Sequence, residues 1–308
     1  MIYTLTLNPS IDYHIRLESF SQGVINPVKE EWKAAGGKGI NVSKVLKSLG
    51  KESTALGYVG GFTGAFIQKE VEKLGISHRF ISVEEDSRIN LKMKAETETE
   101  ITGLSPAIPH AATKQLLQQL QDLNAEDFLV LAGSVPNSLP SDIYQTIMKE
   151  LQPKGVRIFL DAKGHALQQG LSSRPFLIKP NHHELGELFN VTILSAEEAL
   201  RYGAEAVAMG AENVIVSLAG KGAVFVNSEL SLIAEIPPSE PVNSIGAGDS
   251  MVAGFLYAFT QRLEAEEAFR FAVAAGSTTA LSQGFCTPEQ IKAFLPKVQI
   301  KNIKKKGV

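Results

Sequence analysis

The sequence predicts an α/β protein built on a doubly wound, mainly parallel sheet, with a small lid of additional β-strands. Short apolar runs rich in β-branched residues alternate with amphipathic stretches along the chain, and two further segments break this alternation. Strands that are apolar on both sides need helices on both faces of their sheet, which a parallel sheet provides. We expect residues 1–308 to form a single domain, because no linker rich in Pro, Gly or Ser divides them.

Capping residues and apolar runs locate individual helices and strands along the chain. Ser195 with Glu198, and Thr287 with Gln290, have the spacing of capping boxes and mark two helix starts. The expected strands lie at residues 2–8, 53–60, 128–135, 156–162, 176–181 and 213–220, and the expected helices at 41–50, 65–75 and 141–155.

Residues 11–34 and 88–102 are the two segments that break the pattern. They alternate polar and apolar residues without helical periodicity, which is typical of strands with one wet face. We expect them to form a small antiparallel lid beside the main sheet. Its exposed apolar side would cover an active site or pair with another subunit, as in a homodimer.

The composition excludes several classes of protein. The net charge of -3 argues against a general nucleic-acid surface. The single cysteine, Cys286, excludes an internal disulfide framework and favours a reducing compartment. No apolar run reaches the roughly 18 residues that span a bilayer. We therefore expect a cytoplasmic protein.

Common phosphate-binding and hydrolytic motifs are missing from the sequence. Residues 219–222, Ala-Gly-Lys-Gly, have glycine where a P-loop needs Ser or Thr. The Gly-x-Gly at residues 246–248 lacks the third glycine of a dinucleotide fingerprint and lies far from the first strand. Neither H-E-x-x-H nor G-x-S-x-G occurs.

The stretch "VNSIGAGDSMVAGF" at residues 242–255 places Gly246, Gly248 and Asp249 directly before an apolar run with helical spacing. A helix N-terminus behind a glycine loop attracts anions, because its free N–H groups point outward and its dipole is positive there. Asp249 has two interpretations from these residues alone. It is either a first-turn acid of the helix or a general base for a hydroxyl that attacks a bound phosphoryl group.

Seven motifs in order resemble the ribokinase-like (PfkB) carbohydrate kinases. "IGAGDS" at residues 245–250 and "AAGGKGINVSKVLKSLG" at 34–50 resemble the paired signatures of that family. The others are "TLNPSID" (6–12), "RINLKM" (88–93), "LAGSVP" (131–136), "KPNHHEL" (179–185) and "VSLAGKGA" (216–223). The resemblance spans almost the whole chain and implies a kinase that uses ATP and Mg²⁺.

The resemblance assigns roles to the residues around the glycine loop and the nucleotide. Asp249 would be the general base, and the main-chain amides of the loop formed by Gly246, Ala247 and Gly248 would hold the transferred phosphoryl group. Glu184 would position magnesium through water, although it is equally a first-turn acid, and His182 and His183 would face solvent. The nucleotide-binding residues would be Lys179, Asn181, Ser217, Gly220 and Gly222.

The acceptor is implied to be a ketohexose phosphate, with fructose 1-phosphate expected and tagatose 6-phosphate or fructose 6-phosphate as the alternatives. Lys38 and Arg88 would hold its phosphate, unless they are solvated surface cations. Asn243-Ser244 replaces the family's frequent Asp-Thr, which puts activation by potassium in doubt. The alternatives are a kinase for a neutral sugar or nucleoside, and a non-catalytic regulator that binds a sugar phosphate. The remaining substrate-binding residues would be Asp12, Gly37, Asn41 and Ser134.

Overall fold

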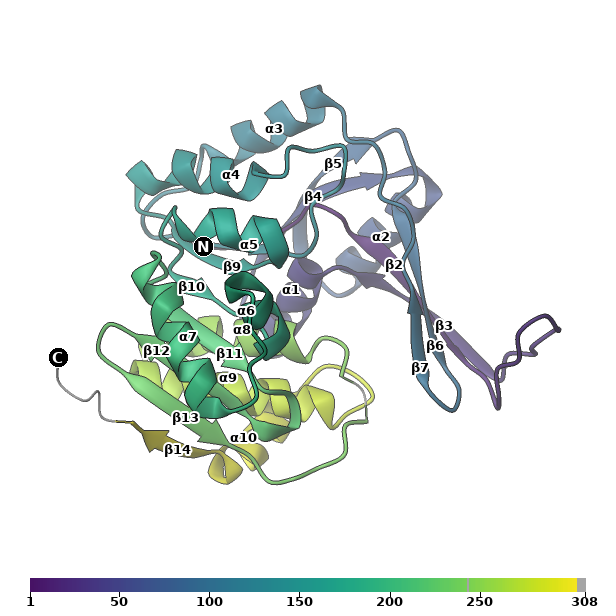
Figure 1. Cartoon of the computed structure of the whole chain (residues 1–308). Helices are drawn as coiled ribbons and strands as arrows, with labels where there is room; N and C mark the ends of the chain where they lie inside the picture. The colour runs from purple at the N-terminus through teal and green to yellow at the C-terminus, as the bar shows by residue number, and fades with distance from the viewer. Residues whose placement is uncertain (243, 304–308) are drawn as a thin grey trace.

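The computed structural model describes residues 1–242 and 244–303 and has the predicted α/β architecture (Figure 1). Its strands are β1 (Ile2–Thr6), β2 (Ser10–Arg16), β3 (Glu30–Gly36), β4 (Thr54–Gly60), β5 (Ser77–Val83), β6 (Arg88–Lys94), β7 (Glu98–Ile101), β8 (Phe128–Ala132), β9 (Arg157–Asp161), β10 (Leu177–Ile178), β11 (Asn213–Ser217), β12 (Ala223–Asn227), β13 (Ser231–Glu235) and β14 (Gln299–Asn302).

The main sheet has ten strands in the order β14-β13-β12-β11-β10-β9-β8-β1-β4-β5. In this order across the sheet, each strand from β11 through β10, β9, β8, β1 and β4 to β5 runs parallel to its neighbour, as predicted. At the other edge β12, β13 and β14 are antiparallel, a feature that the alternation of strands and helices did not predict. The expected strand at 176–181 is reduced to β10, because Asn181 already caps the next helix.

The helices cover both faces of this sheet (Figure 1). Those from α3 to α7 pack on one face, and α1, α8, α9 and α10 pack on the other. Among the described residues, no helix combines the length and apolar character needed to cross a membrane. The helices are α1 (Lys38–Ser48), α2 (Gly61–Lys73), α3 (His110–Leu120), α4 (Ile143–Leu151), α5 (Gly164–Leu171), α6 (His182–Phe189), α7 (Ala196–Ala208), α8 (Ala247–Thr260), α9 (Ala265–Ala280) and α10 (Pro288–Phe294).

The two predicted capping boxes have different outcomes. Thr287 and Gln290 form a complete box at the start of α10, which confirms that prediction. At α7, Ser195 accepts a hydrogen bond from the Glu198 N–H at 3.1 Å, but the Glu198 carboxylate accepts from Leu194 rather than from Ser195. The helix start is therefore correct, while the reciprocal half of the second box is wrong.

The lid is a separate four-stranded sheet in the order β3-β2-β6-β7, and it extends away from the main sheet (Figure 1). The prediction of an antiparallel lid is partly wrong, because its central pair, β2 and β6, is parallel. The reason is topological. Strand β2 follows β1 and β6 follows β5, and both leave the carboxyl edge of the same parallel sheet, so they run outward in the same direction.

Candidate active site

A cavity of about 930 Å³ lies between the lid and the carboxyl ends of the parallel strands. Ligands of open α/β sheets bind at this edge, because the loops that follow the strands gather there. Every site residue predicted from the sequence lines this cavity: Asp12, Gly37, Lys38, Asn41, Arg88, Ser134, Lys179, Asn181, Glu184, Ser217, Gly220, Gly222, Gly246, Ala247, Gly248 and Asp249.

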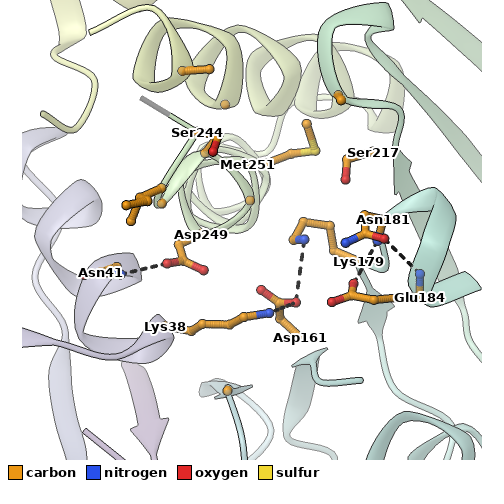
Figure 2. Close-up of a pocket in the computed structure, with 18 of the residues that line it drawn as sticks. Lys38, Asn41, Asp161, Lys179, Asn181, Glu184, Ser217, Ser244, Asp249 and Met251 are labelled. Carbon is orange, nitrogen blue, oxygen red and sulfur yellow. Dashed lines mark hydrogen bonds and ion pairs between the residues drawn. The ribbon is translucent and has the colours of Figure 1, made fainter. Parts of the chain in front are cut away.

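Asp249 stands in the first turn of α8 with only 6% of its surface exposed. Its Oδ2 accepts a hydrogen bond from Asn41 Nδ2 at 2.8 Å (Figure 2). Burial raises the pKa of this carboxyl group to about 6, although the nearby Lys38 ammonium acts in the opposite direction. The N-cap of α8 is Gly246, so the carboxylate of Asp249 is not needed as the cap.

The two glycines before Asp249 lie close to other side chains, and the backbone conformation of Gly246 also requires glycine. Gly246 has a φ of 78°, and a Cβ there would lie 2.4 Å from the ring of Phe285. A Cβ at Gly248 would lie 2.9 Å from Lys179 Nζ. The missing side chain at Gly248 therefore brings a lysine ammonium group to the N-terminus of α8.

The buried charge cluster, formed by the buried Asp161, Lys179 and Asp249 and the half-buried Lys38, lines the cavity (Figure 2). Asp161 ends strand β9, and its Oδ1 lies 3.0 Å from Lys38 Nζ and 3.6 Å from Lys179 Nζ. Burial alone would raise the pKa of Asp161, but the two ammonium groups outweigh it and hold the pKa below its ordinary value. One carboxylate thus fixes two cations beside Asp249.

Three residues with predicted substrate roles have protein partners in this structure. The Lys38 ammonium pairs with Asp161, and its pKa is raised because the negative charges of Asp161 and Asp249 outweigh its burial. Arg88 instead belongs to the lid and donates its Nε–H to the Asn8 carbonyl at 3.3 Å. The side-chain amide of Asn41, expected at a sugar hydroxyl, donates to Asp249.

The lid side of the cavity carries a second polar group. Asp12 on β2 accepts hydrogen bonds from Ser10 Oγ at 2.8 Å and Asn90 Nδ2 at 3.2 Å. Lys92 Nζ lies 3.2 Å from Asp12 Oδ2 and 3.8 Å from a Glu100 oxygen. Sequence reasoning missed Asn90 and Lys92. Their signal was the alternation along β6, which places them on the same face as Arg88.

The opposite side is built on the start of α6. Asn181 caps this helix by accepting the N–H groups of His183 and Glu184, and Glu184 Oε2 accepts the Asn181 N–H at 2.9 Å. Asn181 also pairs with Ser217 at the end of β11. Both histidines line the cavity; His183 is exposed as expected, but the expectation for His182 is wrong, because it is half-buried.

The residues near α6 fit a magnesium ion that is held mainly by a nucleotide. Glu184 spends one carboxylate oxygen on the helix cap, and Figure 2 shows the carboxylate directed toward Asp161. Within the described residues, no group of three or more His, Cys, Asp or Glu side chains could hold a metal directly. Such a sparse set suits Mg²⁺, which keeps several waters and binds one or two carboxylates together with substrate phosphates.

The glycine turn after β11 and the loop before α8 complete this side. Gly222 has a φ of 97°, and a Cβ there would lie 2.0 Å from the Ala234 carbonyl oxygen. Gly220 has open space around it, so sterics do not explain its glycine. Asn243, on which the expectation about potassium depends, lies outside the described residues.

Comparisons with known proteins agree with the resemblance seen in the motifs. A 1-phosphofructokinase of Bacillus subtilis is 47% identical over 300 residues, covering 97% of this chain and 99% of that protein. A D-tagatose-1-phosphate kinase of Bacillus licheniformis is 34% identical, covering 98% and 100%. The crystal structure of phosphofructokinase-2 from Escherichia coli with substrates and products has a TM-score of 0.91 at 28% identity, covering 96% and 98%.

The family model described as "pfkB family carbohydrate kinase" matches residues 5–292. This match covers the main sheet up to β13, the lid and the cavity between them. The predicted family is therefore confirmed, and the chain belongs to the pfkB family of carbohydrate kinases.

Proposed function

We propose that the chain transfers the γ-phosphoryl group of ATP to fructose 1-phosphate, which gives fructose 1,6-bisphosphate and ADP. The observation that carries this proposal is the position of Asp249, a buried carboxylate that lines the cavity at the N-terminus of α8. The choice of acceptor is supported by the name of the Bacillus subtilis relative. This reaction needs a general base close to the anion-binding N-terminus of a helix.

Asp249 would accept the proton of the attacking hydroxyl. With a pKa of about 6, it is mostly ionised at pH 7 and still a stronger base than an ordinary aspartate. The hydrogen bond from Asn41 orients one carboxylate oxygen and leaves the other for the acceptor. Positioning and electrostatic stabilisation supply most of the rate in phosphoryl transfer, so a fixed base is more useful here than a covalent nucleophile.

Lys38 and Lys179 would stabilise the negative charge on the transferred group. Both are held by Asp161, which prevents them from pairing with Asp249 and keeps their ammonium groups beside it. The amides of Ala247 and Gly248 would add donors from the first turn of α8. Glu184 and Asp161 would hold magnesium through water, and the ion would neutralise charge on the nucleotide phosphates.

The acceptor would lie under the lid. Arg88 and Lys92 offer two cations for its existing phosphate, and Asp12 offers acceptors for its hydroxyl groups. Ser134 would contact it from the loop after β8. A lid that covers the acceptor also excludes water, which would otherwise accept the phosphoryl group.

The test is a comparison of kcat/KM for fructose 1-phosphate, fructose 6-phosphate, tagatose 6-phosphate and unphosphorylated fructose, with ADP release as the signal. We expect fructose 1-phosphate to give the highest value. A preference for another phosphosugar would make the chain a 6-phosphofructokinase or a tagatose-6-phosphate kinase. A preference for fructose would favour the neutral-sugar alternative, and saturable binding without turnover would favour the regulator.

The proposal includes a homodimer formed through the lid. Ile89 and Ile101 are 40% and 58% exposed, and the strand register places both on the face that is turned away from Arg88 and Asn90. A two-stranded apolar patch of this kind suits a second copy of the same surface. Analytical ultracentrifugation of the wild-type chain and of Ile101→Lys tests it, with a monomeric wild-type chain as the contrary result.

A further inference from the structure

Four segments of the chain pass between the main body and the lid, and we call them crossings: β1 to β2, β3 to α1, β5 to β6 and β7 to α3. All four come together at Asn8 and Pro9. These two residues lie on the crossing from β1 to β2. The crossing into β6 reaches them through Arg88, whose Nε–H bonds the Asn8 carbonyl at 3.3 Å. The crossing from β7 to α3 reaches them through Ser105. At the crossing from β3 to α1, a Cβ on Gly37 would lie 3.3 Å from Pro9 Cα.

The side chain of Asn8 bonds one of these crossings and the loop that follows β8. Its Nδ2 donates to Ser105 Oγ at 2.7 Å and to Ser134 Oγ at 3.3 Å. The residue is only 4% exposed and lines the cavity. A primary amide has two N–H donors in one plane, which suits it to hold two hydroxyls in a fixed relation. Burying such a group is costly unless its hydrogen bonds are made; Nδ2 makes both of its bonds, whereas Oδ1 has no partner among the described residues.

These contacts connect the lid and the main sheet on the acceptor side of the cavity. Arg88 belongs to the lid, whereas Ser134 follows β8 of the main sheet. The residues on the nucleotide side have other partners, since Asn181 pairs with Glu184 and Ser217. A change at Asn8 would therefore act on one half of the cavity.

We propose that Asn8 is a positioning residue for the acceptor. Its side chain holds the Ser105 crossing against Ser134, and this fixes the main-chain carbonyl of Asn8 that accepts from Arg88, so that Arg88 and Ser134 face the same sugar phosphate. This inference rests on the proposed function in taking the acceptor to be a sugar phosphate. It assigns Asn8 no contact with the reacting atoms, so its loss weakens acceptor binding and leaves the chemical step and the nucleotide largely unaffected.

The test compares Asn8→Ala with Ser105→Ala by steady-state kinetics, with fructose 1-phosphate and ATP each varied. Ser105 is outside the cavity lining and its hydroxyl bonds Asn8, so we expect its effect on the acceptor to pass through Asn8. From the modest net strength of single hydrogen bonds, we expect the KM for fructose 1-phosphate to rise about 5- to 20-fold in Asn8→Ala and about 2- to 5-fold in Ser105→Ala. The KM for ATP and kcat should stay within about twofold of wild type.

Ser138→Ala is the matched control. Its hydroxyl also ties the crossing between β7 and α3, through the Ile108 N–H at 2.9 Å and the Pro106 carbonyl at 3.3 Å, but it does not touch Asn8. We expect this variant to keep the wild-type KM. Adding Ser105→Ala to Asn8→Ala should cause no further loss, because both changes break the same bond.

An unchanged acceptor KM in Ser105→Ala, an equal effect in Ser138→Ala, or an equal rise in the KM for ATP would overturn the proposal. If Asn8→Ala does not fold, the two serine variants decide alone. A wild-type chain that prefers another phosphosugar would overturn the proposed acceptor instead, and the same variants would then be compared with that sugar.

Discussion

The two walls of the cavity hold their charged groups in different ways. On the main-sheet wall, Asp161, Lys179 and Asp249 are 1%, 4% and 6% exposed, and they stand at strand ends or in the first turn of a helix. On the lid wall, Arg88 and Lys92 stand on the same face of strand β6, and the Lys92 side chain, 11% exposed, pairs with Asp12 and Glu100 of the lid itself. The first wall is packed into the core, whereas the second depends on the placement of a small separate sheet.

This difference separates the chemical step from recognition of the acceptor. Charges fixed in the core cost no rearrangement when the phosphoryl group moves, which is the condition for strong electrostatic stabilisation. Charges on the lid can follow a substrate and enclose it. Changes on the main-sheet wall should therefore act on kcat, and changes on the lid wall should act on the KM for the sugar phosphate.

The largest expected effect is on the main-sheet wall, at Asp249→Asn. Loss of a general base lowers kcat by about 10²- to 10⁴-fold, with KM values within a fewfold of wild type. The melting temperature at pH 7 should not fall. Burial raises the pKa of Asp249 from the 3.8 of an ordinary aspartate to about 6 in the folded chain, so ionisation opposes folding increasingly above pH 3.8 and fully above pH 6, and Asn removes that cost.

Steady-state kinetics and thermal unfolding check this prediction, and retained binding of fructose 1-phosphate is its control. A kcat close to that of the wild-type chain would show that Asp249 is only a first-turn acid, and the contrast between the two walls would lose its main support.

The next effect is on the pH dependence of kcat. Asp249 must be ionised to accept a proton, so kcat should fall about tenfold per pH unit below pH 6. Lys38 lowers the pKa of Asp249, so Lys38→Ala should move this acid limb to higher pH as well as reducing kcat. Rate profiles between pH 5 and 8 measure both. A limb that stays in place or moves to lower pH contradicts the coupling within the buried charge cluster.

A smaller effect is expected on the lid wall, at Lys92→Met. This change removes one of the two cations that we propose for the acceptor phosphate, and we expect the KM for the sugar phosphate to rise about tenfold while kcat changes less than about twofold. Lys94→Met is the control on the same strand, because Lys94 is exposed and pairs with Glu98. A loss in kcat at unchanged KM would place Lys92 with the chemical step and remove the distinction between the walls.

The last prediction concerns unfolding, where we expect no effect: the lid should show no unfolding transition separate from that of the main sheet. If residues 1–308 form a single domain, the lid and the main sheet unfold together. Trp32 is the only tryptophan and stands on lid strand β3, so its fluorescence reports on the lid, whereas far-ultraviolet circular dichroism reports on the whole chain. Coincident urea midpoints are expected, and a lower midpoint for Trp32 would separate the lid as its own unit.

The positions of the site residues could be predicted from the sequence because motifs that follow parallel strands gather at one edge of the sheet. Asp249 and Asn181 both lie where their motifs place them, on helix starts at that edge. Asp161 was within reach of the same reasoning, because it ends an apolar run, but no family motif drew attention to it.

The pairing of side chains could not be predicted in the same way. Asn41 and Asp249 are 208 residues apart in the chain, and their hydrogen bond depends on the packing of α1 against α8. The lid shows the same limit, because alternating polarity reveals a strand with one wet face but not its direction. Only the path of the chain out of β1 and β5 makes β2 and β6 parallel.

That parallel pair determines when the lid can form. Its partners Asp12 and Asn90 are separated by 78 residues, and the segment between them includes two strands and two helices of the main body. Closing so long a loop carries an entropic cost that local contacts cannot offset, so the pairing is slow. A ribosome must release roughly the first third of the chain before the sugar-binding half of the enzyme can begin to assemble.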